Sequence, residues 1–337
     1  MSAATYISRA PELTPATAFL ELVKPDLVAI EERLNREIAS DVRTVYNLSG
    51  HVLCAGGKRL RPAMVALSAK AIGPKPDSAR VETVGAAVEL VHMATLVHDD
   101  VVDDTATRRG HPTANAVFGN GIAVLTGDYL LAKAMRLLAV DGDLRIIRTV
   151  SDITIEMSEG EVMELAATGD PTVALSVYFE ILRKKTAVFV EGCCRCGALI
   201  AGADSEHEHA LAQYGYHLGM AFQVADDLLD YTGDPTVTGK PLGSDLRDGR
   251  ATLPFLLAQQ DGIETEKLSR LFGDPELTDT AVADVVGTLG SAGILDRTRL
   301  VAREHVENAA AALNPLSPSP AKDAFLALTD FVVQRDR

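Results

Sequence analysis

Apolar residues recur at intervals of three and four along most of the chain, the spacing that places them on one face of an α-helix. The first such stripe runs from Leu27 to Ile38, and the preceding Pro25 and Asp26 are typical of a helix N-terminus. The same spacing predicts helices over residues 42–48, 62–72, 78–99, 119–140, 146–165, 178–203 and 219–231, and amphipathic helices over the remainder to residue 337.

Composition supports an all-α fold. Alanine and leucine are abundant, aromatic residues make up 5% of the chain and tryptophan is absent, which favours helices over strands. The length of 337 residues allows about two domains, but no proline- or glycine-rich linker divides the middle of the chain. We therefore expect a single-domain helical bundle over residues 18–337, preceded by a flexible N-terminal arm over residues 1–17 that lacks the pattern of a secretion signal.

Charge and hydropathy exclude two classes of function. The net charge of −15 argues against a nucleic-acid partner, because no surplus of Lys and Arg is available to neutralise a phosphate backbone. The longest apolar runs are interrupted by charges such as Asp128, short of the ~18 uninterrupted residues of a transmembrane segment. Cys193, Cys194 and Cys196 lack zinc-site spacing and are expected to be small buried hydrophobes. These features predict a cytoplasmic protein.

Two acidic segments are the main candidates for chemistry. The first, from Val88 to Arg109, places His92, Asp99 and Asp103 within roughly 40° of one another on a helix, and also contains Asp100 and Asp104. The second, Phe222 to Asp230, repeats the arrangement. Its acidic side chains are Asp226, Asp227 and Asp230, and Gln223 shares a face with Asp227 and Asp230.

Carboxylates at this spacing repel one another unless a cation neutralises them or one of them is protonated. Hard oxygen ligands suit Mg²⁺, which usually binds one or two carboxylates and completes its shell with water and substrate phosphate. A phosphorylated substrate is therefore implied.

Basic residues are concentrated near these segments. Lys58, Arg59 and Arg61 lie on a glycine-rich turn and form a candidate anion cradle, with a solvated basic loop as the alternative. Arg108 and Arg109 follow the first acidic segment and are suited to gripping diphosphate oxygens on two ligands.

Other polar residues leave alternatives open. Lys185 with Thr186 and the loop residue Lys240 are equally consistent with ordinary structural positions. His92 is expected to bond to phosphate, whereas His98 is expected to pack against the fold. A row of glutamates is most simply a solvated helix face and comprises Glu156, Glu159, Glu161 and Glu164.

In combination these motifs resemble the trans-prenyltransferases, the polyprenyl diphosphate synthases that elongate an allylic diphosphate with isopentenyl diphosphate. The resemblance covers about residues 40–335 and rests on GGKRLRP from Gly56, HDDVVDD from His98, RRG from Arg108, KT at Lys185, FQVADDLLD from Phe222 and GKPLGSDL from Gly239. It implies an all-helical bundle around a deep central cavity, usually as a homodimer, and about three Mg²⁺ ions per active site.

The resemblance also implies roles for individual residues. Isopentenyl diphosphate would be held by Lys58, Arg61, His92 and Arg109. The allylic substrate would be contacted by Arg108, Lys185, Thr186, Gln223 and Lys240. Mg²⁺ would be bound by Asp99, Asp100, Asp103, Asp226, Asp227 and Asp230. One departure is Arg250, where the family often has lysine, so a ligand role for this residue does not carry over.

The product length should depend on the residues below the first acidic motif, where bulky aromatics stop growth early in this family. Here Ala94 and Thr95 stand at those positions, with Val91 and Val88 deeper, so nothing large blocks the predicted tunnel. We expect an all-trans product longer than geranylgeranyl diphosphate, of the kind used for quinone side chains, and such a lipophilic product gives a reason for peripheral membrane association at release.

Several alternatives remain open on the sequence alone. A geranylgeranyl diphosphate synthase, a terpene cyclase or a head-to-head condensing enzyme would share the fold, although cyclases usually lack the GGKRLRP segment found at Gly56. A non-catalytic synthase subunit or a lipid-binding helical protein belongs to a different functional class. Such subunits typically lose acidic-motif carboxylates, which this chain keeps.

Overall fold

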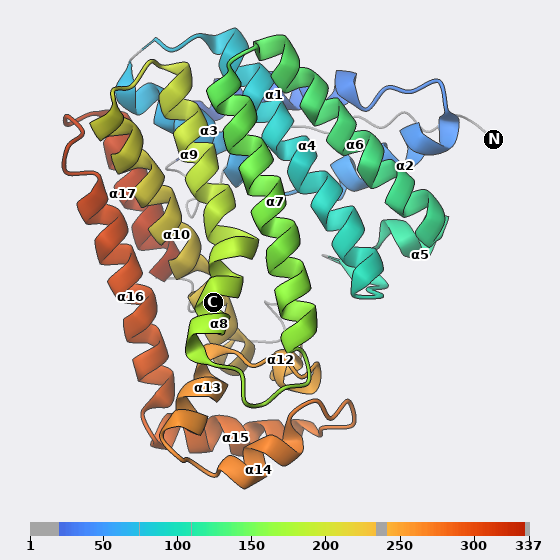
Figure 1. Cartoon of the computed structure of the whole chain (residues 1–337), viewed down its shortest axis with the longest axis vertical. Helices are drawn as coiled ribbons and strands as arrows, with labels where there is room; N and C mark the ends of the chain where they lie inside the picture. Colours follow the sequence, from blue (N-terminus) through green and yellow to red (C-terminus); the bar gives the residue numbers. More distant parts are fainter. Residues whose placement is uncertain (1–19, 74, 109, 234–240, 334–337) are drawn as a thin grey trace. The chain divides into compact units, whose positions relative to one another are not determined.

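A computed structural model of the chain describes residues 20–73, 75–108, 110–233 and 241–333, and almost all of its regular structure is helical (Figure 1). Within these ranges the strands are limited to a two-residue antiparallel ribbon, β1 (Thr107–Arg108) with β2 (His111–Pro112). The predicted all-α fold is thus confirmed. None of the helices in the described ranges combines the length and apolar character that crossing a membrane requires.

The described residues group into two compact units. Those of the first unit lie within Met1–Asp152, Gly192–Leu211 and Pro315–Phe325, and those of the second lie within Ile153–Glu191, Ala212–Asn314 and Leu326–Arg337. Each unit is described separately below. The single domain expected over residues 18–337 stays a prediction, and the predicted N-terminal arm lies outside the described residues.

The first unit is built around α4, which packs against α6, α1 and α3 (Figure 1). Its own helices are α1 (Lys24–Glu37), α2 (Arg43–Cys54), α3 (Leu60–Ile72), α4 (Ser78–Val102), α5 (Ala114–Phe118) and α6 (Asn120–Asp141). The Asp77 side chain caps α4 by accepting hydrogen bonds from the backbone N–H groups of Ala79 and Arg80 at 3.0 and 3.2 Å. Helices α1 and α4 approach closely at Gly85, where a Cβ atom would lie 2.5 Å from the Ile30 side chain.

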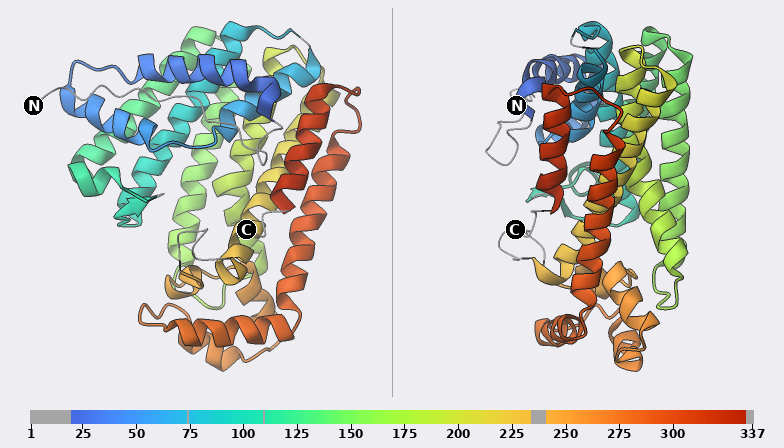
Figure 2. Two further views of the ribbon diagram at one scale, coloured as in Figure 1. Left: turned by 180° about the vertical axis from the view of Figure 1, so that it is seen from behind. Right: turned by 90° about the vertical axis from the view of Figure 1, so that its left-hand side faces the viewer.

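The second unit contains α8 (Leu175–Leu182), a π-helical turn η2 (Arg183–Ala187), α12 (Ser244–Arg247), α13 (Leu253–Gln260), α14 (Thr265–Leu271), α15 (Asp279–Ser291) and α16 (Ile294–Ala312). Helix α16 packs against α13 and α15, an arrangement that both views in Figure 2 show. The core of this unit includes the fully buried Tyr231 and Phe255. Four helices contribute residues to both units: α7 (Leu144–Ala167), α9 (Val188–Ile200), α10 (Ser205–Thr232) and α17 (Pro320–Val333).

The predicted interior residues are buried. Leu27 and Ile30 on α1 have 2% or less of their surface exposed, as the first apolar stripe requires. Cys193, Cys194 and Cys196 are free and buried, in agreement with their prediction as small hydrophobes.

Candidate active site

The first acidic motif lies at the C-terminal end of α4. Asp99 is partly exposed, while Asp103 immediately follows the helix, is exposed, and donates its backbone N–H to the Asp99 carbonyl at 2.8 Å. Asp100, one residue further round the helix than Asp99, has only 5% of its surface exposed. The motif therefore divides into accessible carboxylates at Asp99 and Asp103 and a buried carboxylate at Asp100.

Arg108 is the partner of the buried aspartate. Its Nε donates a hydrogen bond of 2.7 Å to Asp100 Oδ1, and Asn115 Nδ2 donates to the Asp100 backbone carbonyl at 3.0 Å. The β1–β2 ribbon, in which Arg108 pairs with His111, thus folds back against the end of α4. This arrangement holds Arg108 beside the first acidic motif, whereas Arg109 lies outside the described residues.

The glycine-rich basic turn precedes α3, and its three cations are not equivalent. Arg59 is 6% exposed and adopts a left-handed backbone conformation with φ 49°. Its guanidinium donates two hydrogen bonds to Glu31, at 2.9 and 3.0 Å, and one to Glu89, at 2.8 Å. Burial lowers the pKa of Arg59, but attraction to Glu89 and hydrogen bonds with Glu31 outweigh this effect and raise it above its ordinary value.

The expectation that all three cations form an anion cradle is therefore wrong for Arg59, whose charge is compensated inside the fold. Lys58 is exposed. Arg61, on the first turn of α3, lies with its Nη1 3.0 Å from His92 Nε2 on α4. The structure thus brings together two of the four residues predicted to hold isopentenyl diphosphate.

Other residues of α4 have packing roles. His98 Nε2 lies 3.1 Å from the Val124 carbonyl and 3.5 Å from Asp128 on α6, in agreement with its predicted packing role. The hydroxyl of Thr95 donates to the His92 carbonyl at 2.9 Å. The remaining residues proposed to determine chain length have at most 2% of their surface exposed: Val88, Val91 and Ala94.

The second acidic motif, on α10, also divides into accessible and buried carboxylates. Asp226 is exposed, whereas Asp227 is 6% exposed. Both oxygens of Asp227 accept a hydrogen bond, Oδ2 from the Tyr178 hydroxyl at 2.7 Å and Oδ1 from Gln223 Nε2 at 3.1 Å. Burial raises the pKa of Asp227 to about 7, and these hydrogen bonds oppose the rise. The structure thus shows Asp227 bound by Tyr178 and Gln223, and its predicted contact with a metal ion stays a prediction.

Asp230 joins α10 to the segment that follows residues 234–240. Its Oδ1 accepts hydrogen bonds from the Ser244 backbone N–H at 3.0 Å and hydroxyl at 2.6 Å, and its Oδ2 accepts from the Asp245 N–H at 3.1 Å. The carboxylate therefore binds the first turn of α12. Lys240, predicted to reach the allylic diphosphate, lies outside the described residues.

Lys185 and Thr186 lie in the π-helical turn η2, a structure often found at functional sites. Lys185 Nζ is 2.8 Å from Glu161 Oε2 and also pairs with Glu164, both on α7. Burial lowers the pKa of Lys185, but attraction to Glu164 and Glu161 outweighs it, so the pKa is raised. The hydroxyl of Thr186 donates to Gln223 Oε1 at 3.2 Å. Thr186 and Gln223, which were both predicted to contact the allylic substrate, are thus in contact with each other.

The prediction that the α7 glutamates form a solvated face is wrong for Glu156, Glu161 and Glu164, which are only partly exposed, whereas Glu159 is exposed as predicted. Besides the pairs with Lys185, Glu156 pairs with Arg183 at 2.5 Å and with Lys184 at 2.7 Å, and Glu159 pairs with Lys184 at 2.6 Å. Hydrogen bonds with Arg183 lower the pKa of Glu156. The row of glutamates therefore connects α7 to η2 through ion pairs.

Two glycines allow neighbouring helices to approach η2. A Cβ atom at Gly160 of α7 would lie 2.7 Å from the Lys184 side chain, and one at Gly219 of α10 would lie 2.6 Å from Ala187 Cα. Larger residues at either position would displace the turn. Close packing by α7 and α10 thus fixes the part of the chain that carries Lys185 and Thr186.

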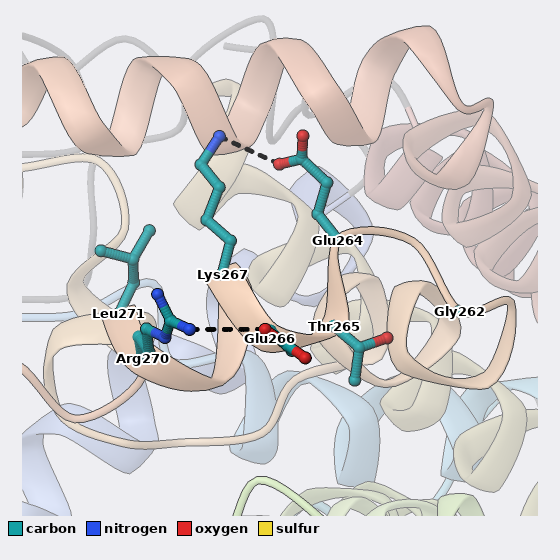
Figure 3. A pocket seen from close by; sticks show the side chains of 7 residues that line it. All are labelled: Gly262, Glu264, Thr265, Glu266, Lys267, Arg270 and Leu271. Carbon is teal, nitrogen blue, oxygen red and sulfur yellow. Dashed lines mark hydrogen bonds and ion pairs between the residues drawn. The ribbon is translucent and has the colours of Figure 1, made fainter.

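No preformed metal cluster is found in the described part of the chain: no three His, Cys, Asp or Glu side chains there converge closely enough to hold an ion. A shallow depression at α14 contains none of the predicted site residues (Figure 3). There Lys267 pairs with Glu264 at 2.9 Å and Arg270 with Glu266 at 3.3 Å, all on the surface.

Comparison with known proteins gives a consistent result. The polyprenyl synthetase family model matches residues 42–289. Octaprenyl diphosphate synthase of Escherichia coli is 36% identical over 94% of this chain and 98% of the relative. Nonaprenyl diphosphate synthase of Mycobacterium tuberculosis is 34% identical over 94% of each chain. The crystal structure of a polyprenyl synthase from Caulobacter crescentus, complexed with calcium and isoprenyl diphosphate, superposes with a TM-score of 0.89 at 35% identity and covers 97% of this chain and 100% of that one.

The chain therefore belongs to the polyprenyl synthetase family. It has the all-α fold of the isoprenoid synthases and is an enzyme, a trans-prenyltransferase, as its motifs predict.

Sequence reasoning missed two residues near the site. Tyr178 binds the side chain of Asp227, and Asn115 binds the backbone carbonyl of Asp100, each from a distant position in the sequence. No spacing signal connects Tyr178 with Asp227, which is 49 residues away.

Proposed function

We propose that the protein is a magnesium-dependent, long-chain, all-trans polyprenyl diphosphate synthase that condenses isopentenyl diphosphate with an allylic diphosphate. One observation carries the proposal. Both acidic motifs offer an exposed or partly exposed first aspartate, Asp99 and Asp226, in a chain matched over most of its length by octaprenyl and nonaprenyl diphosphate synthases.

The donor set fits Mg²⁺. Asp99, Asp103 and Asp226 supply hard carboxylate oxygens, which suit an ion that takes its further ligands from water and diphosphate. We assign these three residues as the principal ligands, about three ions being bound together with the allylic diphosphate. Asp100, Asp227 and Asp230 support them through their hydrogen bonds. The ions would stabilise negative charge on the leaving diphosphate.

The basic residues divide between the two substrates. Lys58, Arg61, His92 and Arg109 bind isopentenyl diphosphate, and the contact between Arg61 and His92 supports this assignment. The allylic diphosphate is bound by Arg108, Lys185 and Lys240. Lys185 already pairs with Glu161 and Glu164, and the third N–H of its ammonium group would contact a diphosphate oxygen.

The chemistry requires charge stabilisation and exclusion of water. Loss of diphosphate from the allylic carbon leaves a carbocation, which the double bond of isopentenyl diphosphate attacks, and the departing diphosphate takes the proton that is lost. Arg108 and Lys240 stabilise the leaving diphosphate electrostatically. Thr186 and Gln223 provide neutral dipoles beside the cation, where water would hydrolyse it.

A product longer than geranylgeranyl diphosphate, used for a quinone side chain, is supported by the small side chains at Ala94 and Thr95 and by the long-chain relatives. The enzyme acts as a homodimer, and its lipophilic product draws it to a membrane surface at release. No terpene cyclase activity is expected, because a cyclase has no use for the basic turn at Gly56–Pro62.

The test is incubation of the purified full-length protein with Mg²⁺, isopentenyl diphosphate and either farnesyl or geranylgeranyl diphosphate, followed by chromatographic sizing of the products. We expect all-trans chains longer than 20 carbons, with none formed when EDTA replaces the metal. Products of 20 carbons or fewer would disprove the chain length, and cyclic or absent products would disprove the reaction.

A further inference from the structure

Three consecutive hydrogen bonds connect α8, α10 and η2 within the second unit. They run from the Tyr178 hydroxyl to Asp227, from the Gln223 amide to Asp227, and from the Thr186 hydroxyl to Gln223, at 2.7, 3.1 and 3.2 Å. We propose that Tyr178 is a positioning residue for prenyl transfer, acting through Asp227 and Gln223 to fix the direction of the Thr186 hydroxyl. This inference rests on the proposed function.

The donor and acceptor groups of each side chain set the direction of this series of hydrogen bonds. Asp227 Oδ1 accepts the amide hydrogen of Gln223, so Nε2 must face Asp227 and Oε1 must face η2. Oε1 can only accept, so Thr186 donates its single hydroxyl hydrogen to it. The Thr186 oxygen therefore has only lone pairs to offer any other neighbour.

Tyr178 fixes the direction of these hydrogen bonds from the end opposite Thr186. With 4% of its surface exposed, it has no access to bulk water, and its ring packs edge-on against Phe179 at 5.1 Å between centroids. Without its hydroxyl, Asp227 Oδ2 would be a buried acceptor lacking that donor, so the carboxyl group would rotate or recruit another hydrogen. Either change allows the Gln223 side-chain amide to turn over. Its oxygen and its nitrogen are similar in size and differ mainly in whether they accept or donate a hydrogen bond.

The direction matters because of the charge that develops in the reaction. An oxygen that presents lone pairs attracts an electron-deficient allylic carbon, whereas a hydroxyl hydrogen pointing the same way repels it. Turning the Gln223 amide would present Nε2 to Thr186 and reverse its hydroxyl. Substrate binding would be little affected, since the diphosphate groups are bound by other residues.

A double-mutant cycle tests the proposal in the full-length protein with Mg²⁺, using Tyr178→Phe, Thr186→Val and their combination. We expect Tyr178→Phe to lower kcat about tenfold, the size of effect that loss of one buried hydrogen bond produces, with KM for both diphosphates changed less than twofold. In the Thr186→Val background the same substitution should change kcat less than twofold, because no hydroxyl remains to be directed.

Tyr231→Phe is the matched control. Tyr231 is another buried tyrosine, on α10, whose hydroxyl lies 3.2 Å from Thr252 Oγ1, outside the chain of hydrogen bonds. Its substitution should reduce stability comparably and act additively with Thr186→Val.

The outcomes are distinct. Equal losses of kcat from Tyr178→Phe in both backgrounds would overturn the proposal, as would a lowered Tm with unchanged kcat per folded molecule. If Tyr178→Phe is not recovered folded, Tyr178→Phe with Asp227→Asn replaces it, since no buried charge then loses its donor and the same loss of coupling is expected. Wild-type protein that makes no polyprenyl product would instead disprove the proposed function itself.

Discussion

The guanidinium of Arg108 donates a 2.7 Å hydrogen bond to the buried carboxylate of Asp100, which separates this aspartate from its accessible neighbours Asp99 and Asp103. Tyr178 and Asp227 have the same relationship in the second acidic motif. In each motif, the second aspartate is held by a side chain from another element, whereas the first reaches the surface. Aspartates of one motif should therefore respond differently to substitution.

We first predict that Asp103→Asn raises the Mg²⁺ concentration for half-maximal activity by about tenfold and leaves Tm nearly unchanged, because the side chain is exposed. Asp100→Asn should lower the free energy of unfolding by about 1–3 kcal/mol and Tm by several degrees. Its effect on the Mg²⁺ requirement should be much smaller. Metal titrations and thermal melts measure both effects. Equal shifts in Mg²⁺ requirement would show that Asp100 is a metal ligand.

Loss of Arg59 should destabilise the first unit strongly. Arg59→Met leaves Glu31 and Glu89 buried without their shared cation, which costs about 3–5 kcal/mol. Lys58→Met, a change of the exposed neighbouring cation, is the control and should alter stability by less than about 0.5 kcal/mol. Urea unfolding compares the two variants. Similar stabilities would mean that the buried ion pairs contribute little.

Product length should depend on how far from the first acidic motif a large side chain is introduced along α4. Ala94→Phe places a ring close to the first acidic motif and should give the shorter products, whereas Val88→Phe lies almost two turns deeper and should stop growth later. Chromatography of dephosphorylated products measures the lengths. If neither variant shortened the product, the growing chain would have to follow a path away from α4.

The pair of His217 on α10 and His305 on α16, with Nδ1 atoms 3.0 Å apart, predicts a loss of stability in mild acid. Burial lowers the pKa of both below the ordinary 6.5, and for His305 the neighbouring imidazole adds to the shift. Since the unfolded chain binds these protons more readily, their contribution to stability is present above about pH 6.5 and lost as pH falls below it.

Urea unfolding at pH 7.5, 6.5 and 5.5 tests this dependence. The doubly substituted His217→Gln/His305→Gln protein should show a flatter decline between pH 6.5 and 5.5 than the wild type, whereas substitution of the exposed His209 by Gln should not. Parallel declines in all three proteins would assign the acid sensitivity to other groups.

The helical fold and the positions of the acidic motifs were predictable because both depend on local spacing. The apolar stripe from Leu27 to Ile38 is buried as its period requires. Which aspartate of each motif is buried was not predictable, because spacing places Asp99 and Asp100 about 100° apart on the helix but does not show which of the two directions another element covers. Their difference depends on Arg108, which a β-ribbon returns to the helix end.

The α7 glutamates illustrate the same limit. Their cationic partners, Arg183, Lys184 and Lys185, are more than 20 residues away and face them only through a π-helical turn, which has no simple sequence signature. An amphipathic pattern shows that a helix face is polar. It does not show whether water or another helix meets that face.

The π-helical turn at Arg183–Ala187 amounts to one extra residue inserted in an otherwise regular helix. Deleting a single residue there would let α8 run uninterrupted into α9 and would rotate one helix relative to the other by about 100°. The orientation of Thr186 relative to Gln223 thus depends on how many residues the segment has as well as on their identities. An insertion or deletion in this segment should consequently be far more damaging than a conservative exchange of any one of its side chains.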